Sequence, residues 1–304
     1  MSSATRPVLP FVAALAGVAC LSLMDALMKS ASLAIGVYTA SLLRSALAAA
    51  LIAPVWLATG PRRPPRPVMR LHAERGVLSA GMALGFFYAL TKLPIAEAIA
   101  LSFCAPILAL YFAHLLLKEA ITRGAIWASL LGLAGTLVIL SGRMGAAGFT
   151  TDTALGLATL AFSAVLYAYS FVVIRRQSQL AGPVEIATFH SAIAALVQAL
   201  ALPFLFVMPD ADAFGITAAA AVLTVLAAVA IAWAYARAEA QALVPIEYSG
   251  FLWAILFGWL FFREAVTLPT VLGAALIVTG CWIAAPRGRK RPLPEPTLPE
   301  PPLR

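Results

Sequence analysis

The chain has 304 residues, of which 62% are apolar and only 11% carry a charge, and its mean hydropathy is +0.94. A water-soluble domain carries roughly a quarter charged residues, so this composition excludes an ordinary soluble protein and indicates a chain that lies in lipid. The formal net charge of +8 does not indicate nucleic acid as a partner, because the basic residues lie in short loops between apolar segments.

Ten apolar segments are predicted to cross a membrane, because a bilayer core about 30 Å thick needs about 20 apolar residues per helix. The first segment follows the N-terminus and lacks a signal-peptide cleavage pattern, so we expect it to remain as a helix. The predicted spans are residues 9–28, 35–58, 76–91, 95–117, 124–141, 154–174, 185–207, 214–236, 243–262 and 267–285.

Most of the 21 lysine and arginine residues lie in the N-terminal segment, in the C-terminal tail or in the loops that follow even-numbered spans. The largest of these loops, at 59–75, carries five arginines. The positive-inside rule then predicts a multi-pass protein of the bacterial inner membrane with both termini in the cytoplasm. Residues 1–8 are the expected cytoplasmic N-terminus, and the basic, proline-rich residues 286–304 are expected to form a disordered tail.

Two short charged phrases reveal an internal repeat. Residues 118–122 read KEAIT and residues 263–267 read REAVT, and we expect each phrase to end a helix at the water surface. The shift that superimposes them spans five predicted helices, an odd number, so the second half enters the membrane from the opposite side. Inverted repeats of this kind are typical of secondary transporters.

The same shift pairs residues throughout both halves. The predicted parts are a first five-helix repeat at 9–141, a connecting loop at 142–153 and a second, inverted repeat at 154–285. The matched pairs include Glu119 with Glu264, Thr122 with Thr267, Tyr88 with Trp233, Lys92 with Arg237, Phe103 with Tyr248 and, after a one-residue slip, Arg44 with His190.

The segment EYSGFLWAILFGWLFFREAVTLPTVLGAALIVTG at 247–280 resembles the EamA-type drug/metabolite transporter superfamily. The motif LMDALMK at 23–29, followed by Arg44, is similar to the pattern of one bacterial branch of that superfamily. This resemblance covers about residues 9–285. It implies an all-α membrane protein with ten transmembrane helices, arranged as two inverted five-helix repeats around a central cavity. It also implies transport of small amphipathic metabolites, since members include exporters of amino acids, among them aromatic ones, and importers of other metabolites.

Ionisable side chains inside membrane segments are costly to bury and therefore mark candidate transport sites. Asp25 lies one turn before Lys29, and Arg44 lies at a similar depth in the next span. The two opposite charges either hold a zwitterionic or charged substrate, with Asp25 titrating during the cycle, or form a structural ion pair between the first two helices. His190 either relays protons or makes an interhelical hydrogen bond. Glu247, at the start of the ninth span, is a candidate for a cavity or gating role.

Aromatic side chains are the other candidates for substrate contact. Most transmembrane aromatics pack against lipid or neighbouring helices, but repeat-matched pairs stand out from that background. The resemblance implies that the third, fourth, eighth and ninth helices line the cavity. The substrate contacts predicted besides the charged residues are Tyr88, Ser102, Phe103, Tyr167, Trp233 and Tyr248. The predicted gating or hinge positions are Lys29, Pro106 and Pro245.

The sequence does not predict an enzyme. It has no glycine-rich phosphate-binding loop, no HExxH motif and no GxSxG motif. Its three cysteines, Cys20, Cys104 and Cys281, lie singly in apolar segments and predict no metal site. We therefore expect no cofactor and no metal.

The predicted function is secondary transport of small amphipathic metabolites, amino acids including aromatic ones above all, by alternating access, with export as the favoured direction. The alternative is an importer of a nucleoside-like or vitamin-like metabolite such as S-adenosylmethionine or riboflavin. A non-transporting membrane scaffold or an intramembrane enzyme is the alternative of another class. The expected partners are the small-molecule substrate, membrane lipids and a proton as coupling ion, with no nucleic acid, and the expected assembly is a monomer or weak dimer.

Overall fold

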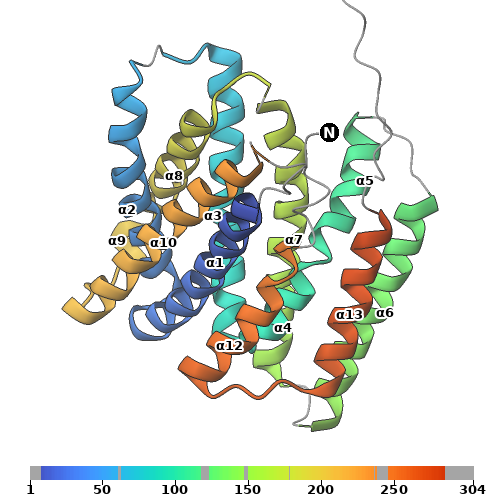
Figure 1. Ribbon diagram of the computed structural model, residues 1–304. Helices are drawn as coiled ribbons and strands as arrows, with labels where there is room; N and C mark the ends of the chain where they lie inside the picture. Colours follow the sequence, from blue (N-terminus) through green and yellow to red (C-terminus); the bar gives the residue numbers. More distant parts are fainter. Residues whose placement is uncertain are drawn as a thin grey trace, which may run out of the picture.

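The structure is a computed structural model that describes residues 8–60, 63–117, 123–146, 150–177, 179–235, 237 and 246–284. Within these ranges all regular secondary structure is helical (Figure 1). Four of the predicted features lie outside the described residues: the N-terminal segment except Val8, the KEAIT phrase at 118–122, Pro245 and the tail at 286–304.

The helices follow the predicted order. The first half comprises α1 (Val8–Ile35), α2 (Val37–Ala58), α3 (Arg66–Lys92), α4 (Ile95–Ser102), α5 (Ala105–Leu117) and α6 (Arg123–Ala146). The second half comprises α7 (Thr151–Gln177), α8 (Pro183–Ala199), α9 (Leu202–Leu205), α10 (Ala211–Tyr235), α12 (Gly250–Phe262) and α13 (Leu268–Ala284).

A single residue, Gly36, connects α1 to α2, and its φ of 80° lies in the region that favours glycine. α1 extends beyond its predicted end, so Lys29 lies inside the helix. We call the end of the bundle at which α1 begins the near end, and the end at which Gly36 turns the chain the far end.

Two predicted boundaries are wrong for identifiable reasons. The loop expected at 59–75 ends early, because α3 begins at Arg66 with prolines around its first turn, where a missing N–H costs nothing. The fourth span is broken into α4 and α5 around Phe103 and Cys104. Pro106 explains this break, since a proline has no N–H to donate to the carbonyl four residues before it, that of Ser102.

The helices contact each other in pairs that respect the repeat. α1 packs on α10 as α3 packs on α7, and α2 packs on α10 as α8 packs on α3. α1 also contacts α12 as α7 contacts α5, and α2 packs on its own repeat-mate α8. Each of these contacts has its equivalent when the two halves are exchanged, so the fold is that of two repeats related by a pseudo-twofold axis.

The last helices of the halves, α6 and α13, lie side by side at one edge of the bundle (Figure 1). Gly135 and Gly273 face each other there, and a Cβ atom added to either would lie 2.5 Å from the other's carbonyl oxygen. Large apolar side chains on the outer face of α6, such as Trp127 and Leu133, are 60% exposed, as is typical of a lipid-facing surface.

Five helical segments of the described chain are long and apolar enough to cross a membrane: Val8–Ile35, Val37–Ala58, Ile95–Leu116, Thr151–Ile174 and Ala211–Ile231. Shorter apolar segments lie in α6, α12 and α13. The chain is therefore a multi-pass membrane protein by length and composition, although fewer helices than the predicted ten meet this criterion. Helix α3 is not among them, since it carries charged residues at both ends.

Candidate functional site

The centre of the candidate site is the pair of opposite charges that the sequence placed at similar depth. Asp25 of α1 is only 8% exposed, and the charge of Arg44 in α2 acts on it. The two groups make no ion pair within 4.0 Å, although both belong to the described residues. Asp25 and Arg44 are thus electrostatic neighbours with a gap between them, and not a closed salt bridge.

The Arg44 guanidinium lies over the ring of Phe87, with Cζ 5.2 Å from the ring centre. Its Nε is buried and has no hydrogen-bond acceptor among the described residues. A cation–π contact with Phe87 compensates a buried guanidinium only partly. Arg44 therefore keeps one N–H, at Nε, for which the described residues offer no acceptor.

His190 of α8 brings the second half of the chain to the same place. Its Nδ1 lies 2.8 Å from the hydroxyl of Ser79 in α3, and the charges of Arg75 and Arg44 act on its ring. Ser79 also lies 2.8 Å from the backbone carbonyl of Arg75, to which its hydroxyl can donate. The interhelical hydrogen bond expected of His190 is present.

Arg75 was not predicted as a site residue, because its position had been assigned to a basic loop. Its Nη1 lies 3.4 Å from Oε1 of Gln177, and its Nε is buried without an acceptor among the described residues. Tyr167, a predicted contact, interacts electrostatically with Arg75 and with Glu247. Pairwise electrostatic interactions thus link the residues from Asp25 to Glu247 in a polar chain, in which Tyr167 is 41% exposed.

A second network fixes the near end of α3. His72 is fully buried, with Nδ1 2.6 Å from Nε2 of Gln177 and Nε2 3.0 Å from a carboxylate oxygen of Glu185. The ring of Phe189 stacks on that of His72 at 4.5 Å between centres. Because Gln177 bonds both His72 and Arg75, this network sets the position of the Arg75 guanidinium.

We call Asp25, Arg44, Arg75, Ser79 and His190 the central cluster. Lys29 does not belong to it. Its ammonium lies 2.5 Å from Oε1 of Glu264 and 2.8 Å from the carbonyl of Leu93, while Oε2 of Glu264 accepts the N–H of Ile95 at 2.8 Å. We call these four residues the far-end junction. It joins α1, the turn before α4 and the segment after α12.

The far-end junction corrects the expectation that REAVT ends a helix at the water surface. The side chain of Glu264 is only 16% exposed and that of Lys29 8%. The gap beside it, lined by Pro94, Glu97 and Gly258 among others, is too narrow to hold water. Thr267 of the same phrase caps α13, since its hydroxyl accepts the N–H of Thr270 at 3.4 Å.

The predicted aromatic pairs separate into one that meets and one that does not. Phe103, at the break between α4 and α5, contacts Tyr248 edge to face at 5.3 Å between ring centres. Tyr88 and Trp233 lie at opposite ends of the bundle, near the ends of α3 and α10. Each lies under a cation four residues later in the chain.

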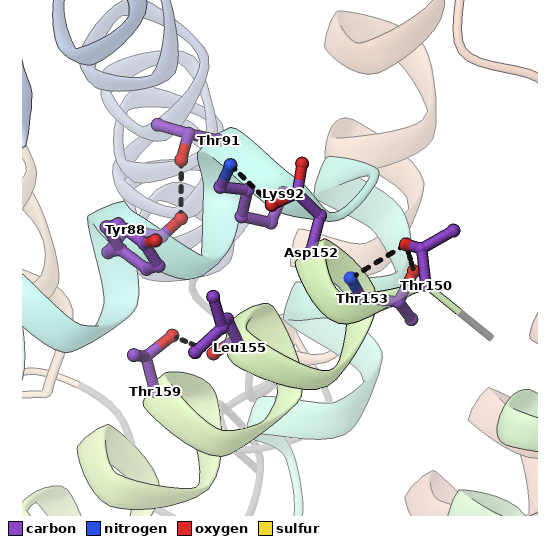
Figure 2. Close-up of polar contacts among 8 residues, drawn as sticks. All are labelled: Tyr88, Thr91, Lys92, Thr150, Asp152, Thr153, Leu155 and Thr159. Carbon is purple, nitrogen blue, oxygen red and sulfur yellow. Dashed lines mark hydrogen bonds and ion pairs between the residues drawn. The ribbon is translucent and has the colours of Figure 1, made fainter.

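Figure 2 shows the surroundings of Tyr88. The ammonium of Lys92 lies 5.9 Å from the Tyr88 ring centre and 2.9 Å from a carboxylate oxygen of Asp152 at the start of α7. At the other end of the bundle, Cζ of Arg237 lies 4.2 Å from the ring centre of Trp233. These repeat-matched pairs occupy the helix ends, so neither aromatic residue belongs to the central cluster.

The remaining predicted positions make local contacts. The hydroxyl of Ser102 donates to the carbonyl of Ala98 in its own helix at 2.8 Å. Pro106 occupies the first turn of α5, directly after the break. No group of three or more His, Cys, Asp or Glu side chains in the described ranges is arranged to hold a metal ion.

The sequence contains a pattern that indicates some of the site residues which were not predicted. His72, Gly76 and Ser79 follow one another at helical spacing, which places them on one face of α3. A Cβ on Gly76 would lie 2.4 Å from Ile193, so that face packs directly on α8. The partners of Lys29 had no such signal, since Glu264 is remote in the sequence.

Comparison with known proteins gives a consistent result. The family model described as the EamA-like transporter family matches residues 9–141 and again residues 154–285. The pseudopaline exporter CntI of Pseudomonas aeruginosa, from two strains, is 30% identical over 273 residues, covering 88% of this chain and 93% of the exporter. An uncharacterized transporter of Helicobacter pylori is 28% identical, covering 69% of this chain and 72% of its own. One crystal structure superimposes with a TM-score of 0.63 at 25% identity, covering 90% of this chain and 96% of that one.

Proposed function

Because the chain belongs to the EamA-like transporter family, we propose that it is a secondary transporter that exports amino acids, including aromatic ones, across the bacterial inner membrane. The observation that carries this proposal is the gap between Asp25, which is buried, and Arg44, whose Nε is buried, two opposite charges that interact without forming an ion pair. The ammonium and the carboxylate of a zwitterionic amino acid match these two groups in sign. A structural ion pair, in contrast, would be expected to close.

The neighbouring side chains support an amphipathic substrate. Phe87 lies beside the Arg44 guanidinium, and Phe103 and Tyr248 form an aromatic pair from the two halves of the chain. Aromatic walls with few, well-placed polar groups are typical of sites for small organic ligands. The remaining predicted contacts, Tyr167, His190 and Glu247, belong to the polar chain and keep their assigned roles in this proposal.

Alternating access follows from the paired packing of the halves. Inverted repeats exchange conformations so that a central site opens to either side in turn. In this proposal the far-end junction holds one end of the bundle closed, and Lys29 and Glu264 must separate when that end opens. The break at Phe103 and Cys104 supplies a hinge next to Pro106.

Direction and energy source are part of the same proposal. Export is supported by the Pseudomonas relative, an exporter that this chain matches over most of its length. Both termini lie in the cytoplasm by the distribution of basic residues. Asp25 is the group that would exchange a proton with the coupling gradient, and the unit of transport is a monomer or weak dimer surrounded by lipid.

Counterflow into proteoliposomes tests the proposal. Purified protein is placed in vesicles preloaded with one unlabelled compound, and uptake of the labelled form is followed for phenylalanine, leucine, glutamine, glutamate, a nucleoside and riboflavin. Saturable counterflow of amino acids is expected. Flux of the nucleoside or riboflavin alone would support the importer alternative, and absence of any flux would support a scaffold. Indifference of uptake to an imposed pH gradient would contradict proton exchange at Asp25.

A further inference from the structure

The positive charges of the central cluster outnumber its negative ones. Arg44 and Arg75 are both guanidinium groups, which stay protonated in proteins, and both act on His190. The carboxylate of Asp25 acts on Arg44, and no carboxylate of the described residues forms an ion pair with Arg75. If the Asp25 carboxylate and the Arg44 guanidinium take up the two charges of a zwitterion, Arg75 is left without a counter-charge.

The surroundings of Arg75 do not supply that counter-charge. Its side-chain hydrogen bond, from Nη1 to the amide oxygen of Gln177 at 3.4 Å, goes to a neutral group. Its Nε is buried without an acceptor among the described residues. A buried arginine inside a membrane bundle is costly unless an anion or several acceptors compensate it.

The nearby carboxylates are directed to other groups. A carboxylate oxygen of Glu74, the residue before Arg75, lies 2.5 Å from the hydroxyl of Tyr169. Glu185 accepts from His72 at 3.0 Å, and Glu247 acts on Tyr167. No ion pair joins Arg75 to a carboxylate in the described part of the chain.

The Arg75 side chain is nevertheless fixed in place. Gln177 is held by its hydrogen bond to the fully buried His72, and Ser79 connects the α3 backbone at Arg75 to the His190 ring. Arg75 and Ser79 lie one turn apart on α3, and Ser79 contacts the His190 ring of α8 at 2.8 Å. This arrangement is preorganised for an anion that reaches past Arg44 toward α7.

We infer that Arg75 is a second anion-binding residue of the central site, and that the substrate is an amino acid with a second carboxylate. This inference rests on the proposed function and narrows it. A substrate with one ammonium and two carboxylates has the net charge of −1 that complements Asp25, Arg44 and Arg75 together. The planar fork of a guanidinium binds a carboxylate by two parallel hydrogen bonds, which an ammonium or an amide does not match.

Glutamate and glutamine provide the sharpest test, because they have nearly the same size and differ in one negative charge. Counterflow of each labelled compound is measured in proteoliposomes with the wild-type protein and with Arg75→Gln, Arg75→Lys and Arg70→Gln. Arg70 lies on the same helix and is exposed, so Arg70→Gln is the matched control for removal of an arginine.

The wild-type protein is expected to favour glutamate over glutamine at least about tenfold in apparent affinity, which corresponds to about 1.4 kcal/mol. Arg75→Gln is expected to bring that ratio close to one, Arg75→Lys to retain part of the preference, and Arg70→Gln to leave it unchanged. The ratio is the readout that a purely structural role of Arg75 would not move.

Three results would overturn the inference. Equal transport of both compounds by the wild-type protein shows that the second carboxylate is not recognised, while the proposed amino acid transport stands. An unchanged ratio in Arg75→Gln assigns the preference to another residue. Absence of flux for every amino acid contradicts the proposed function and this inference together. If Arg75→Gln fails to fold, the wild-type ratio and Arg75→Lys still decide the question.

Discussion

Two polar regions of this bundle differ in how completely their charged side chains are hydrogen-bonded. In the far-end junction, Lys29 and Glu264 bond each other and also bond the backbone of Leu93 and Ile95. In the central cluster, Arg44 and Arg75 each bury an Nε without an acceptor among the described residues. The comparison separates a region that is complete in the protein alone from one that, in our proposal, is completed by the substrate.

The largest effect should come from breaking the junction. Glu264→Gln leaves the buried Lys29 ammonium without a counter-charge, and removal of one partner of a buried pair costs about 3–5 kcal/mol. The free energy of unfolding of the purified protein in detergent is expected to fall by about this amount, which lowers the melting temperature. Replacing both residues by methionine should recover much of it, because no uncompensated charge remains. Equal stability of the wild-type protein and Glu264→Gln would show that the junction does not hold the fold together.

Substitutions in the central cluster should reduce transport and leave the stability of the fold nearly unchanged. Arg44→Gln removes the partner of the substrate carboxylate, so counterflow should fall roughly 100-fold, since a hydrogen bond to a charged group contributes about 1.5–3 kcal/mol. The thermal stability should change little, because the guanidinium has few partners to lose. Arg44→Lys, which keeps the positive charge but lacks the planar guanidinium with its parallel N–H donors, should retain partial transport. Unfolding of Arg44→Gln would instead support a structural pair with Asp25.

A smaller effect is expected at the contact between the halves. Ser79→Ala removes the hydroxyl next to His190 Nδ1, and the loss of one interhelical hydrogen bond should lower the free energy of unfolding by about 1 kcal/mol. Ser141→Ala is the matched control, because that exposed hydroxyl donates only within its own helix. Chemical denaturation of both variants gives the comparison, and an equal change in both would remove Ser79 from the interhelical contacts.

The smallest effect should come from the exposed pair in Figure 2. The side chains of Lys92 and Asp152 are 26% and 66% exposed, so solvent already screens their attraction. Asp152→Asn should change stability by no more than about 0.5 kcal/mol. A loss as large as that of Glu264→Gln would contradict the view that burial distinguishes the two ion pairs.

Much of the fold could be predicted from the sequence, because each apolar segment is long compared with its loops. The repeat was also predictable from the charged phrases, whereas the contact of Phe103 with Tyr248 was not, since the same register also pairs Tyr88 with Trp233, which lie apart. The start of α3 was predicted wrongly, because its arginines were interpreted only as loop residues that determine topology. Helix α3 continues through them, and its inner face carries His72 and Ser79.

The partner of Lys29 could not be predicted in the same way. Asp25 lies one turn away and is the obvious candidate by local spacing, whereas Glu264 reaches Lys29 only because α1 packs against α12. Contacts of this kind depend on tertiary packing, for which one sequence contains no direct signal. The REAVT phrase therefore has two structural roles, an ion pair at Glu264 and a helix cap at Thr267.

Gly36, the single residue between α1 and α2, has a consequence for substrate selectivity. Only the two backbone dihedral angles of Gly36 separate the helices, and its φ of 80° is strained for any residue with a side chain. The spacing between the Asp25 carboxylate and the Arg44 guanidinium therefore depends on the angle that the two helices make at Gly36. A site that presents two opposite charges at a given spacing selects ligands by the distance between their own opposite charges.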